Sequence, residues 1–214
     1  MFDKIYVLMK RIILTIALFI IIINIASAQL TIGPKIGLNM SKEYSGIKLY
    51  GLSYDENVDF KAGLNIGAFG KYEINDKFDI QAELLYSQQG FKHNVPLADY
   101  GGNVIKDGYK FSSHYFNIPL VIKYYPFERI YLEAGPQAGF CLNSKLSPKE
   151  YAEGILDMDY NTIDFSLVGG IGLDIGYGLS VNARYNHGFT YTLQDSKWKN
   201  RVIQISLAYN LWNF

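Results

Sequence analysis

Cysteine is almost absent from the 214-residue chain, which contains only Cys141. One cysteine cannot form an internal disulfide, so disulfide bonds do not hold this fold together. Neither sign of charge dominates either, because 20 Lys and Arg residues balance 20 Asp and Glu residues. A chain without a basic excess offers no electrostatic reason to expect a nucleic-acid partner. The composition therefore excludes a disulfide scaffold and disfavours nucleic-acid binding.

Long apolar runs are missing as well, except at the N-terminus. There, three basic residues precede the apolar segment Ile12–Ile25, and the sequence Ala-Ser-Ala follows at 26–28. A basic head, an apolar middle and an A-x-A exit are typical of a secretory signal peptide. We therefore expect residues 1–28 to be a signal peptide, cleaved after Ala28, and residues 29–214 to form the mature domain.

A retained N-terminal anchor is the alternative, but the apolar run is shorter than the about 20 residues that a spanning helix needs. The start codon stays open between Met1 and Met9, because Met9 is followed directly by two basic residues. Without the residues before Gln29, 17 basic and 19 acidic residues remain, a net charge near −2. No other apolar run approaches spanning length, so a membrane-embedded mature domain would have to use strands.

Aromatic residues and glycines are plentiful, with 18 Tyr, 13 Phe and 20 Gly, which favours an all-β fold. The clearest pattern lies in Asp164–Gly188, where apolar residues occupy alternate positions on both sides of a turn at 176–178. The opposite face carries small and polar residues together with Asp174 and Arg184. A period of two with a glycine-rich link predicts a hairpin. An apolar outer face and a polar inner face are typical of a narrow membrane barrel.

The same alternation recurs along the chain and predicts eight strands. Besides the two strands of the hairpin 164–188, they are Leu30–Met40, Phe60–Tyr72, Phe78–Gln89, His114–Tyr125, Ile130–Cys141 and Asn200–Phe214. Long links at 41–59, 90–112, 142–162 and 190–199 alternate with short ones at 73–77, 126–129 and 176–178. This alternation of long and short links is the connectivity of bacterial outer-membrane barrels, which have both termini on the periplasmic, short-turn side.

We therefore predict an all-β fold, an eight-stranded antiparallel up-and-down transmembrane β-barrel in the bacterial outer membrane. A soluble barrel or sandwich with its apolar face inside is the alternative that periodicity alone leaves open. Two local features also stay open. Pro34 interrupts a strand and needs either an edge or a bulge. Trp212 and Phe214 have the opposite parity from Tyr209 and Leu211, so either a bulge intervenes or the last residues leave the barrel.

Charged residues on the polar faces are expected inside the barrel. An eight-stranded barrel is just wide enough for side chains to fill its interior, and buried charges must be paired there. We predict a structural lumen charge network in which Arg184 pairs with Glu83 and Glu133, with Lys123 and Asp174 also in the lumen. A proton or ion path through these groups is the alternative. The glycines Gly170 and Gly172 would relieve crowding beside them.

Histidines are few, and none belongs to a recognisable motif. His93, His114 and His187 lie near the predicted outer rim with Ser112, Ser113, Asp99 and Asp107, so a hydrolase or acyltransferase site there is conceivable. No nucleophile motif accompanies them, and they lack metal-ligand spacing. We therefore expect no enzyme activity, no cofactor and no metal site.

The predicted long loops carry many tyrosines. Tyr50, Tyr54, Tyr100 and Tyr109 are candidates for binding, because loops on rigid scaffolds often carry binding sites and tyrosine is a favoured contact residue. Solvated surface without a partner is the alternative.

Several segments resemble one family. They are GPKIGLNMS (33–41), YLEAGPQAGF (131–140), DFSLVGGIGLDI (164–175), ARYNHGFT (183–190) and RVIQISLAYNLWNF (201–214). Together they resemble the outer-membrane β-barrel family of Bacteroidetes-type bacteria that includes the PorT-like proteins. The resemblance implies a barrel embedded in outer-membrane lipid and inserted by the barrel-assembly machinery.

The expected function is structural or interaction-based, through extracellular loops above a plugged lumen. We expect an unidentified extracellular or secretion-system partner. A PorT-like role as an accessory of secretion belongs to one branch of the family, and the sequence does not assign the chain to that branch. The alternatives are a small pore or transport accessory, or an outer-membrane enzyme at the rim.

Overall fold

A computed structural model describes residues 29–44, 48–49, 52–53, 58–98, 104–148, 161–192 and 198–214. The predicted signal peptide and the loop tyrosines Tyr50, Tyr54 and Tyr100 lie outside these ranges. No helix in the described part of the chain is both long and apolar enough to span a membrane.

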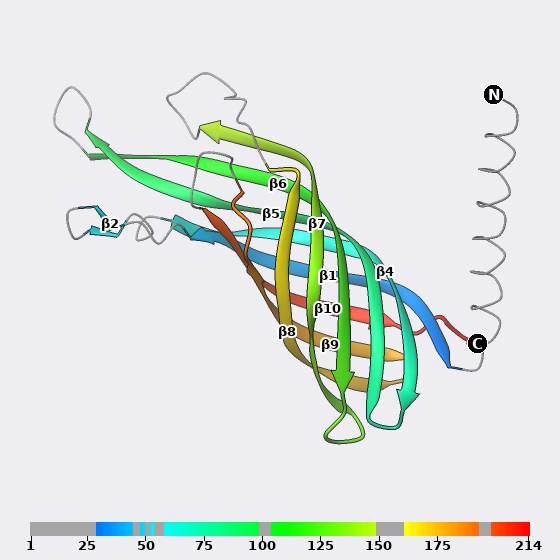
Figure 1. Ribbon diagram of the computed structural model, residues 1–214. Coiled ribbons are helices and arrows are strands. Elements are labelled where there is room, and N and C mark those ends of the chain that lie inside the picture. The colour runs from blue at the N-terminus through cyan, green and yellow to red at the C-terminus, as the bar shows by residue number, and fades with distance from the viewer. Residues whose placement is uncertain are drawn as a thin grey trace, which may run out of the picture.

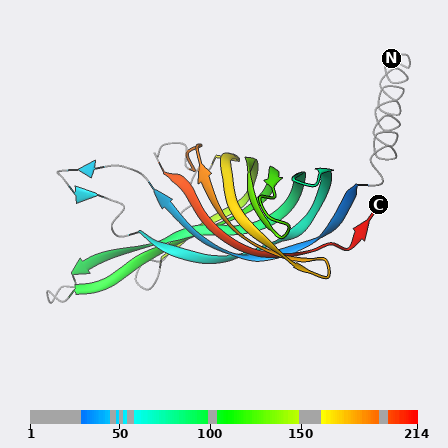
Figure 2. The same ribbon diagram turned by 90° about the horizontal axis from the view of Figure 1, so that it is seen from below.

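Eight long strands form one closed antiparallel barrel (Figure 1), which confirms the predicted fold class. Their bounds are β1 Leu30–Tyr44, β4 Val58–Asn75, β5 Phe78–Ala98, β6 Val104–Tyr124, β7 Ile130–Pro148, β8 Ile163–Gly176, β9 Leu179–Gly188 and β10 Lys199–Tyr209. Each strand pairs with its neighbour in sequence, and β10 pairs with β1 to close the ring. The curvature of the sheet is visible from below in Figure 2. The short strands β2 (Lys48–Leu49) and β3 (Leu52–Ser53) pair with each other in a separate two-stranded sheet.

The outer surface of the barrel is apolar. One row of outward side chains crosses five neighbouring strands, and each member of the row is the register partner of the next. In order, the row contains Ile171, Ala183, Ile205, Leu38 and Leu64. The four large side chains of this row are 50–61% exposed, whereas the polar residues that alternate with them are buried. This arrangement is the reverse of a soluble barrel and fits a wall that faces lipid.

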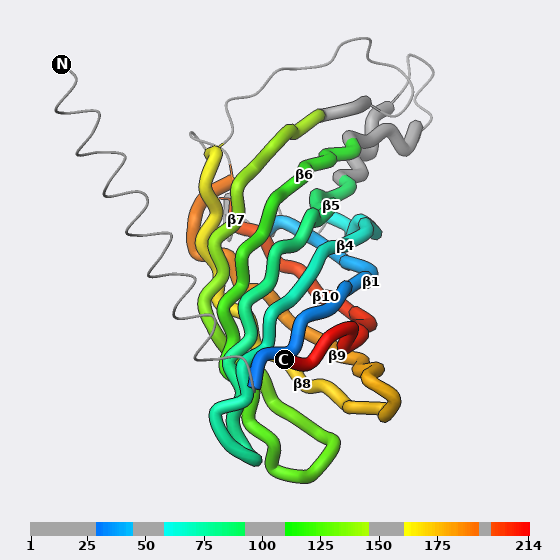
Figure 3. Tube along the Cα trace, turned by 90° about the vertical axis from the view of Figure 1, so that its right-hand side faces the viewer, coloured from blue at the N-terminus to red at the C-terminus, as the bar shows by residue number. Residues whose placement is uncertain are grey.

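Short turns join β4 to β5, β6 to β7 and β8 to β9 at one end of the barrel. The start of β1 and the C-terminus lie at the same end (Figures 1 and 3), as the predicted wiring requires. In the β8–β9 turn, the central residues Tyr177 and Gly178 have φ values of 54° and 79°. Positive φ at both positions is what a type I′ hairpin turn requires, and this turn matches the right-handed twist of the strands.

At the opposite end, several strands run further than the sequence predicted: β1 continues to Tyr44, into the expected loop 41–59, and β5, β6 and β7 extend further still. Residues 90–112 were expected to be a loop, but β5 and β6 stay paired through this region as far as Ala98 and Val104. The β7 strand likewise continues to Pro148, into the expected loop 142–162. Beyond the lipid there is no need for a continuous apolar face, so these extensions lack the alternation that marks a spanning strand.

The seam between the first and last strands contains a bulge. The β1–β10 ladder ends at the Lys35–Ala208 pair, and the register has shifted by one residue where Ile32 pairs with Trp212 in β11 (Trp212–Asn213). Pro34, which has no N–H to donate, lies at this shift. Trp212 thus stays in the barrel wall and points outward, 58% exposed. Of the two explanations for its reversed parity, the bulge is correct.

Candidate functional site

Arg184 lies in the half of the lumen nearer the short turns and binds two carboxylates at once. Its Nη1 and Nη2 donate to Glu83 at 2.7 Å each, and its Nε and Nη2 donate to Glu133 at 2.5 and 2.8 Å. The three side chains come from β9, β5 and β7 and are no more than 3% exposed. The planar guanidinium therefore forms two bidentate pairs, the strongest geometry for an arginine with carboxylates.

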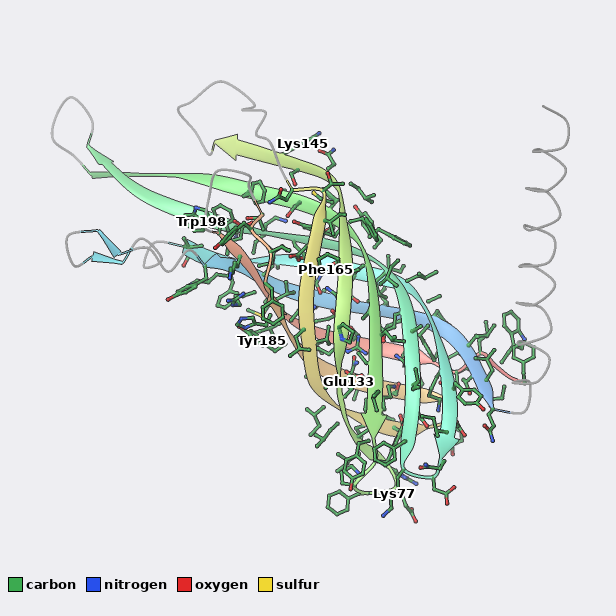
Figure 4. All side chains as sticks on the ribbon, in the orientation of Figure 1. Lys77, Glu133, Lys145, Phe165, Tyr185 and Trp198 are labelled. Atoms are coloured by element: carbon green, nitrogen blue, oxygen red, sulfur yellow. The ribbon has the colours of Figure 1, made fainter. Side chains whose placement is uncertain are left out.

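Other donors complete the coordination of these two carboxylates. Lys35 Nζ donates to both oxygens of Glu83, at 3.0 and 3.2 Å, and Gln81 Nε2 also donates to this carboxylate. Asn182 Nδ2 donates to Glu133 at 2.7 Å. With Lys35 included, the lumen charge network contains two positive and two negative groups. Its charges cancel, which is the condition for burying them. Figure 4 labels Glu133 within the barrel wall, between Lys77 at the short-turn end and Trp198 toward the other end.

Two glycines of β8 make room for this network. A Cβ atom on Gly170 would lie 2.6 Å from the carbonyl oxygen of Ala183, 2.9 Å from Arg184 Cγ and 3.1 Å from Glu133 Oε1. A Cβ atom on Gly172 would lie 2.1 Å from Cζ of Tyr131, whose ring occupies that space. The glycines on the polar face are thus required by the width of the lumen, as their position in the alternation suggested.

Two predicted members of the network have a different environment. Lys123 lies opposite Glu133 in the β6–β7 register, yet its Nζ sits 4.1 Å from the centre of the Tyr131 ring, a cation–π contact. Among the described residues, neither Lys123 nor Asp174 makes an ion pair within 4 Å. The structure therefore places both in the lumen but outside the cluster centred on Arg184.

Tyrosines gather at the short-turn end of the lumen. Tyr125 follows β6, and its ring lies 5.4 Å from that of Tyr131. Burial raises the pKa of the Tyr125 phenol well above its ordinary value, and the carboxylates of Asp174 and Asp79 raise it further. This phenol therefore stays neutral at physiological pH and acts as a hydrogen-bonding group at this end of the barrel.

A layer of amide and hydroxyl groups lies next to the network on its outer side. Asn39 Nδ2 donates to Ser87 Oγ at 2.8 Å, and Asn65 Nδ2 donates to Asn39 Oδ1 at 3.0 Å. Gln204 Nε2 donates to Asn65 Oδ1 at 3.3 Å. These four side chains are 0–3% exposed, so solvent reaches almost none of their surface.

The histidines considered for an enzyme site at the outer rim do not form a common site. His114 points outward and lies 2.6 Å from the hydroxyl of Tyr86, whereas the neighbouring Ser113 points inward and is buried. His187 also faces outward, with its ring against those of Tyr185 and Phe189. The side chains of His93 and Asp107, and Asp99 altogether, lie outside what the structure describes. No Ser–His–Asp arrangement is present among the described side chains.

Of the loop tyrosines, the structure describes only the backbone of Tyr109. This residue was predicted to lie in a loop but belongs to β6, paired with His93 of β5 and Pro148 of β7. The correction has the same cause as the strand extension, because pairing beyond the lipid needs no apolar alternation.

Lys35, Gln81 and Asn182 belong to the network although the sequence did not predict them as its partners. Each lies on the polar face of its strand, and that parity was the available signal. Which residues meet across the lumen depends on the tilt and stagger of the strands, which parity does not specify.

Comparisons with known proteins agree with this architecture. A family model described as outer membrane protein beta-barrel domain matches residues 24–194. No curated protein matches the chain.

Among solved structures, Neisserial surface protein A is similar at a TM-score of 0.52 and 9% identity, covering 84% of this chain and 97% of that protein. The attachment invasion locus protein Ail of Yersinia pestis, solved with the heparin analogue sucrose octasulfate, has a TM-score of 0.47 and 14% identity, covering 85% and 98%. OprG of Pseudomonas aeruginosa has a TM-score of 0.47 and 17% identity, covering 86% and 96%. At these identities the likeness concerns the fold.

The balance of the lumen charge network can be tested by removing its central cation. We expect Arg184→Met to lower the free energy of unfolding by about 3–5 kcal/mol, because Glu133 is then buried without a positive partner. Adding Glu133→Gln should restore much of this loss, since Lys35 and Glu83 remain as a neutral pair. Urea unfolding in detergent micelles measures both variants, with the turn substitution Arg129→Met as a control that should change stability by less than about 0.5 kcal/mol. An Arg184→Met protein with the stability of the wild type would contradict the assignment.

Proposed function

Because the chain belongs to the outer membrane protein β-barrel domain family, we propose that it acts as a non-catalytic outer-membrane barrel with a closed lumen and an extracellular interaction surface. Its location in the bacterial outer membrane follows from the family and the fold. Export through the predicted signal peptide, with cleavage after Ala28, is part of the proposal.

The closed lumen is supported by the burial of its polar contents. Arg184, Glu83 and Glu133 are each no more than 3% exposed, and Asn39 and Asn65 of the adjacent layer are 1% and 0% exposed. Side chains lining a water-filled channel would be accessible to solvent. A lumen packed with mutually bonded side chains is suited to a scaffold rather than to transport.

The interaction surface is supported by the extended strands, and this observation carries the proposal. Beyond the barrel wall, β5 and β6 remain paired from Gly90–Ser112 to Ala98–Val104, and β7 joins them as far as Pro148. Figure 1 shows these strands projecting past the others at the end away from the short turns. A paired sheet loses little conformational freedom when a partner binds, so it forms a pre-organised surface.

The type of partner is a further step of the proposal. In the described residues, β5 pairs with β4 only as far as His93, which leaves the backbone of 94–98 with one free edge. A free strand edge can bind an extended peptide by adding a strand to the sheet. A protein partner at the cell surface or in a secretion system fits such an edge. The PorT-like resemblance supports the secretion system, and the barrel-assembly machinery is needed for insertion.

Photo-crosslinking in living cells tests this function. With a benzoyl-phenylalanine residue at Tyr100 or Tyr109, we expect discrete adducts with a second protein, because Tyr109 belongs to β6 of the projecting hairpin and Tyr100 lies between β5 and β6 in the sequence. Matched positions are Phe127 in a short turn, 68% exposed, and Ile171 on the lipid face, 52% exposed. Adducts restricted to the control positions, or none at any position, would contradict an extracellular interaction surface.

Single-channel recording separates the scaffold from the small pore or transport accessory. We expect the purified protein in planar bilayers to show no steady openings, because the lumen charge network and the amide layer fill the interior. The positive control is a triple variant that lacks the central side chains: Arg184→Ala, Glu83→Ala and Glu133→Ala. If this variant remains folded, it should conduct ions. Large, steady openings of the wild type would overturn the closed-lumen proposal in favour of the pore.

A further inference from the structure

The outer end of the lumen contains two buried carboxylates that form no ion pair within the described part of the chain. Glu43 on β1 is 1% exposed and Asp164 on β8 is 7% exposed, and neither forms an ion pair with any described residue. At the other end of the same lumen, Glu83 and Glu133 are balanced by Arg184 and Lys35. Burying unbalanced charge is costly, so the contrast between the two ends requires an explanation.

Oxygen atoms without a hydrogen-bond donor mark the same place. Both carboxylate oxygens of Glu43 have no partner among the described residues. The hydroxyl of Thr192 is within reach of Glu43 and also lies 3.2 Å from the carbonyl oxygen of Trp198, so it has one hydrogen for two acceptors. Protein donors in the described part of the chain therefore leave this carboxylate unsatisfied.

An amide oxygen is left over next to Glu43, independently of the acidic pair. Asn200 lies directly opposite Glu43 in the β1–β10 register and is 3% exposed. Its Nδ2 contacts Asp164 Oδ2 and the hydroxyl of Tyr115, both at 3.4 Å. Asp164 Oδ1 accepts a hydrogen bond from the hydroxyl of Thr190, and Asp164 Oδ2 accepts the one from Asn200. An amide oxygen cannot face a carboxylate oxygen, so the amide orientation is fixed, and Asn200 Oδ1 has no partner among the described residues.

The available atoms are all hard oxygen donors. They come from β1 and β10, which close the barrel, and from β8, and the phenol of Tyr115 on β6 lies beside them. The described residues contain no group of three or more His, Cys, Asp or Glu side chains placed to bind a metal. A site here would therefore combine two carboxylates with neutral oxygens, and calcium accepts such a mixture of ligands.

We propose that a divalent cation of the calcium type binds at the outer end of the lumen, between Glu43 and Asp164 and with the amide oxygen of Asn200 as a ligand. One such ion cancels the two negative charges, as Arg184 and Lys35 do at the inner end. It also supplies the partner that both oxygens of Glu43 and Oδ1 of Asn200 lack. By joining β1, β8 and β10, the ion ties the closing seam of the barrel together beneath the outer loops.

Calcium titration of the detergent-solubilised, lipid-free full chain, freed of metal with a chelator, tests this site. We expect one calcium ion per protein by isothermal titration calorimetry and a rise in the unfolding midpoint when calcium chloride is added. Glu43→Gln should weaken calcium binding at least tenfold and abolish the rise. The matched control Glu128→Gln, in the exposed turn at the opposite end, should leave both unchanged. Heat-modifiable migration verifies that each variant is folded, and Asp164→Asn gives a second variant with the same expected loss.

Three results would overturn the proposal. The wild type could bind no calcium, or Glu43→Gln and Asp164→Asn could bind it as tightly as the wild type. In the third result, calcium does not change the unfolding midpoint of the wild type, but acidification raises it. The Glu43→Gln variant would then show no increase of the midpoint on acidification. That outcome would mean that a proton, rather than a metal ion, neutralises Glu43.

Discussion

Closure of the backbone ladder is the constraint on which the rest of this structure depends. Lipid offers no hydrogen-bond partners, so every N–H and C=O group of a membrane strand must be paired within the protein. The chain meets this requirement by pairing β1 with β10, and it accommodates Pro34 by shifting the register at the seam. Because the ring has only eight strands, its interior is narrow, and the contents of the lumen follow from that width.

A narrow interior lined by alternate residues explains why small and charged side chains share one face. Gly170 and Gly172 provide the space that Arg184 and Tyr131 occupy, and Arg184 in turn holds Glu83 and Glu133 from two other strands. A buried ion network of this kind is weak evidence for high stability, because desolvation offsets much of the attraction. Its structural consequence is that it joins strands that are distant in sequence across the interior of the barrel.

Much of the fold could be predicted from the sequence, because a period of two carries both the position of a strand and the face of each residue. The positions of Ile171 and Arg184 on opposite faces were correct for this reason. Prediction failed where the physical requirement for alternation ends, beyond the lipid, so Tyr109 was placed in a loop although it lies in β6. The site was predictable only in part. Parity placed Arg184, Glu83 and Glu133 in the lumen, but the contribution of Lys35 and the separation of Lys123 and Asp174 depend on barrel stagger.

The most direct measurement of the central claim is disulfide formation across the closing seam. Leu38 of β1 and Ile205 of β10 are register partners on the lipid face, within reach of a disulfide if the barrel closes as described. In a Cys141→Ser background, oxidation of the Leu38→Cys, Ile205→Cys pair in intact outer membranes should give a cross-linked chain with altered electrophoretic mobility that reduction reverses. The mismatched pair Leu38→Cys, Tyr209→Cys should not cross-link. No cross-link in the matched pair, or equal cross-linking in both, would contradict a barrel closed between β1 and β10 in this register.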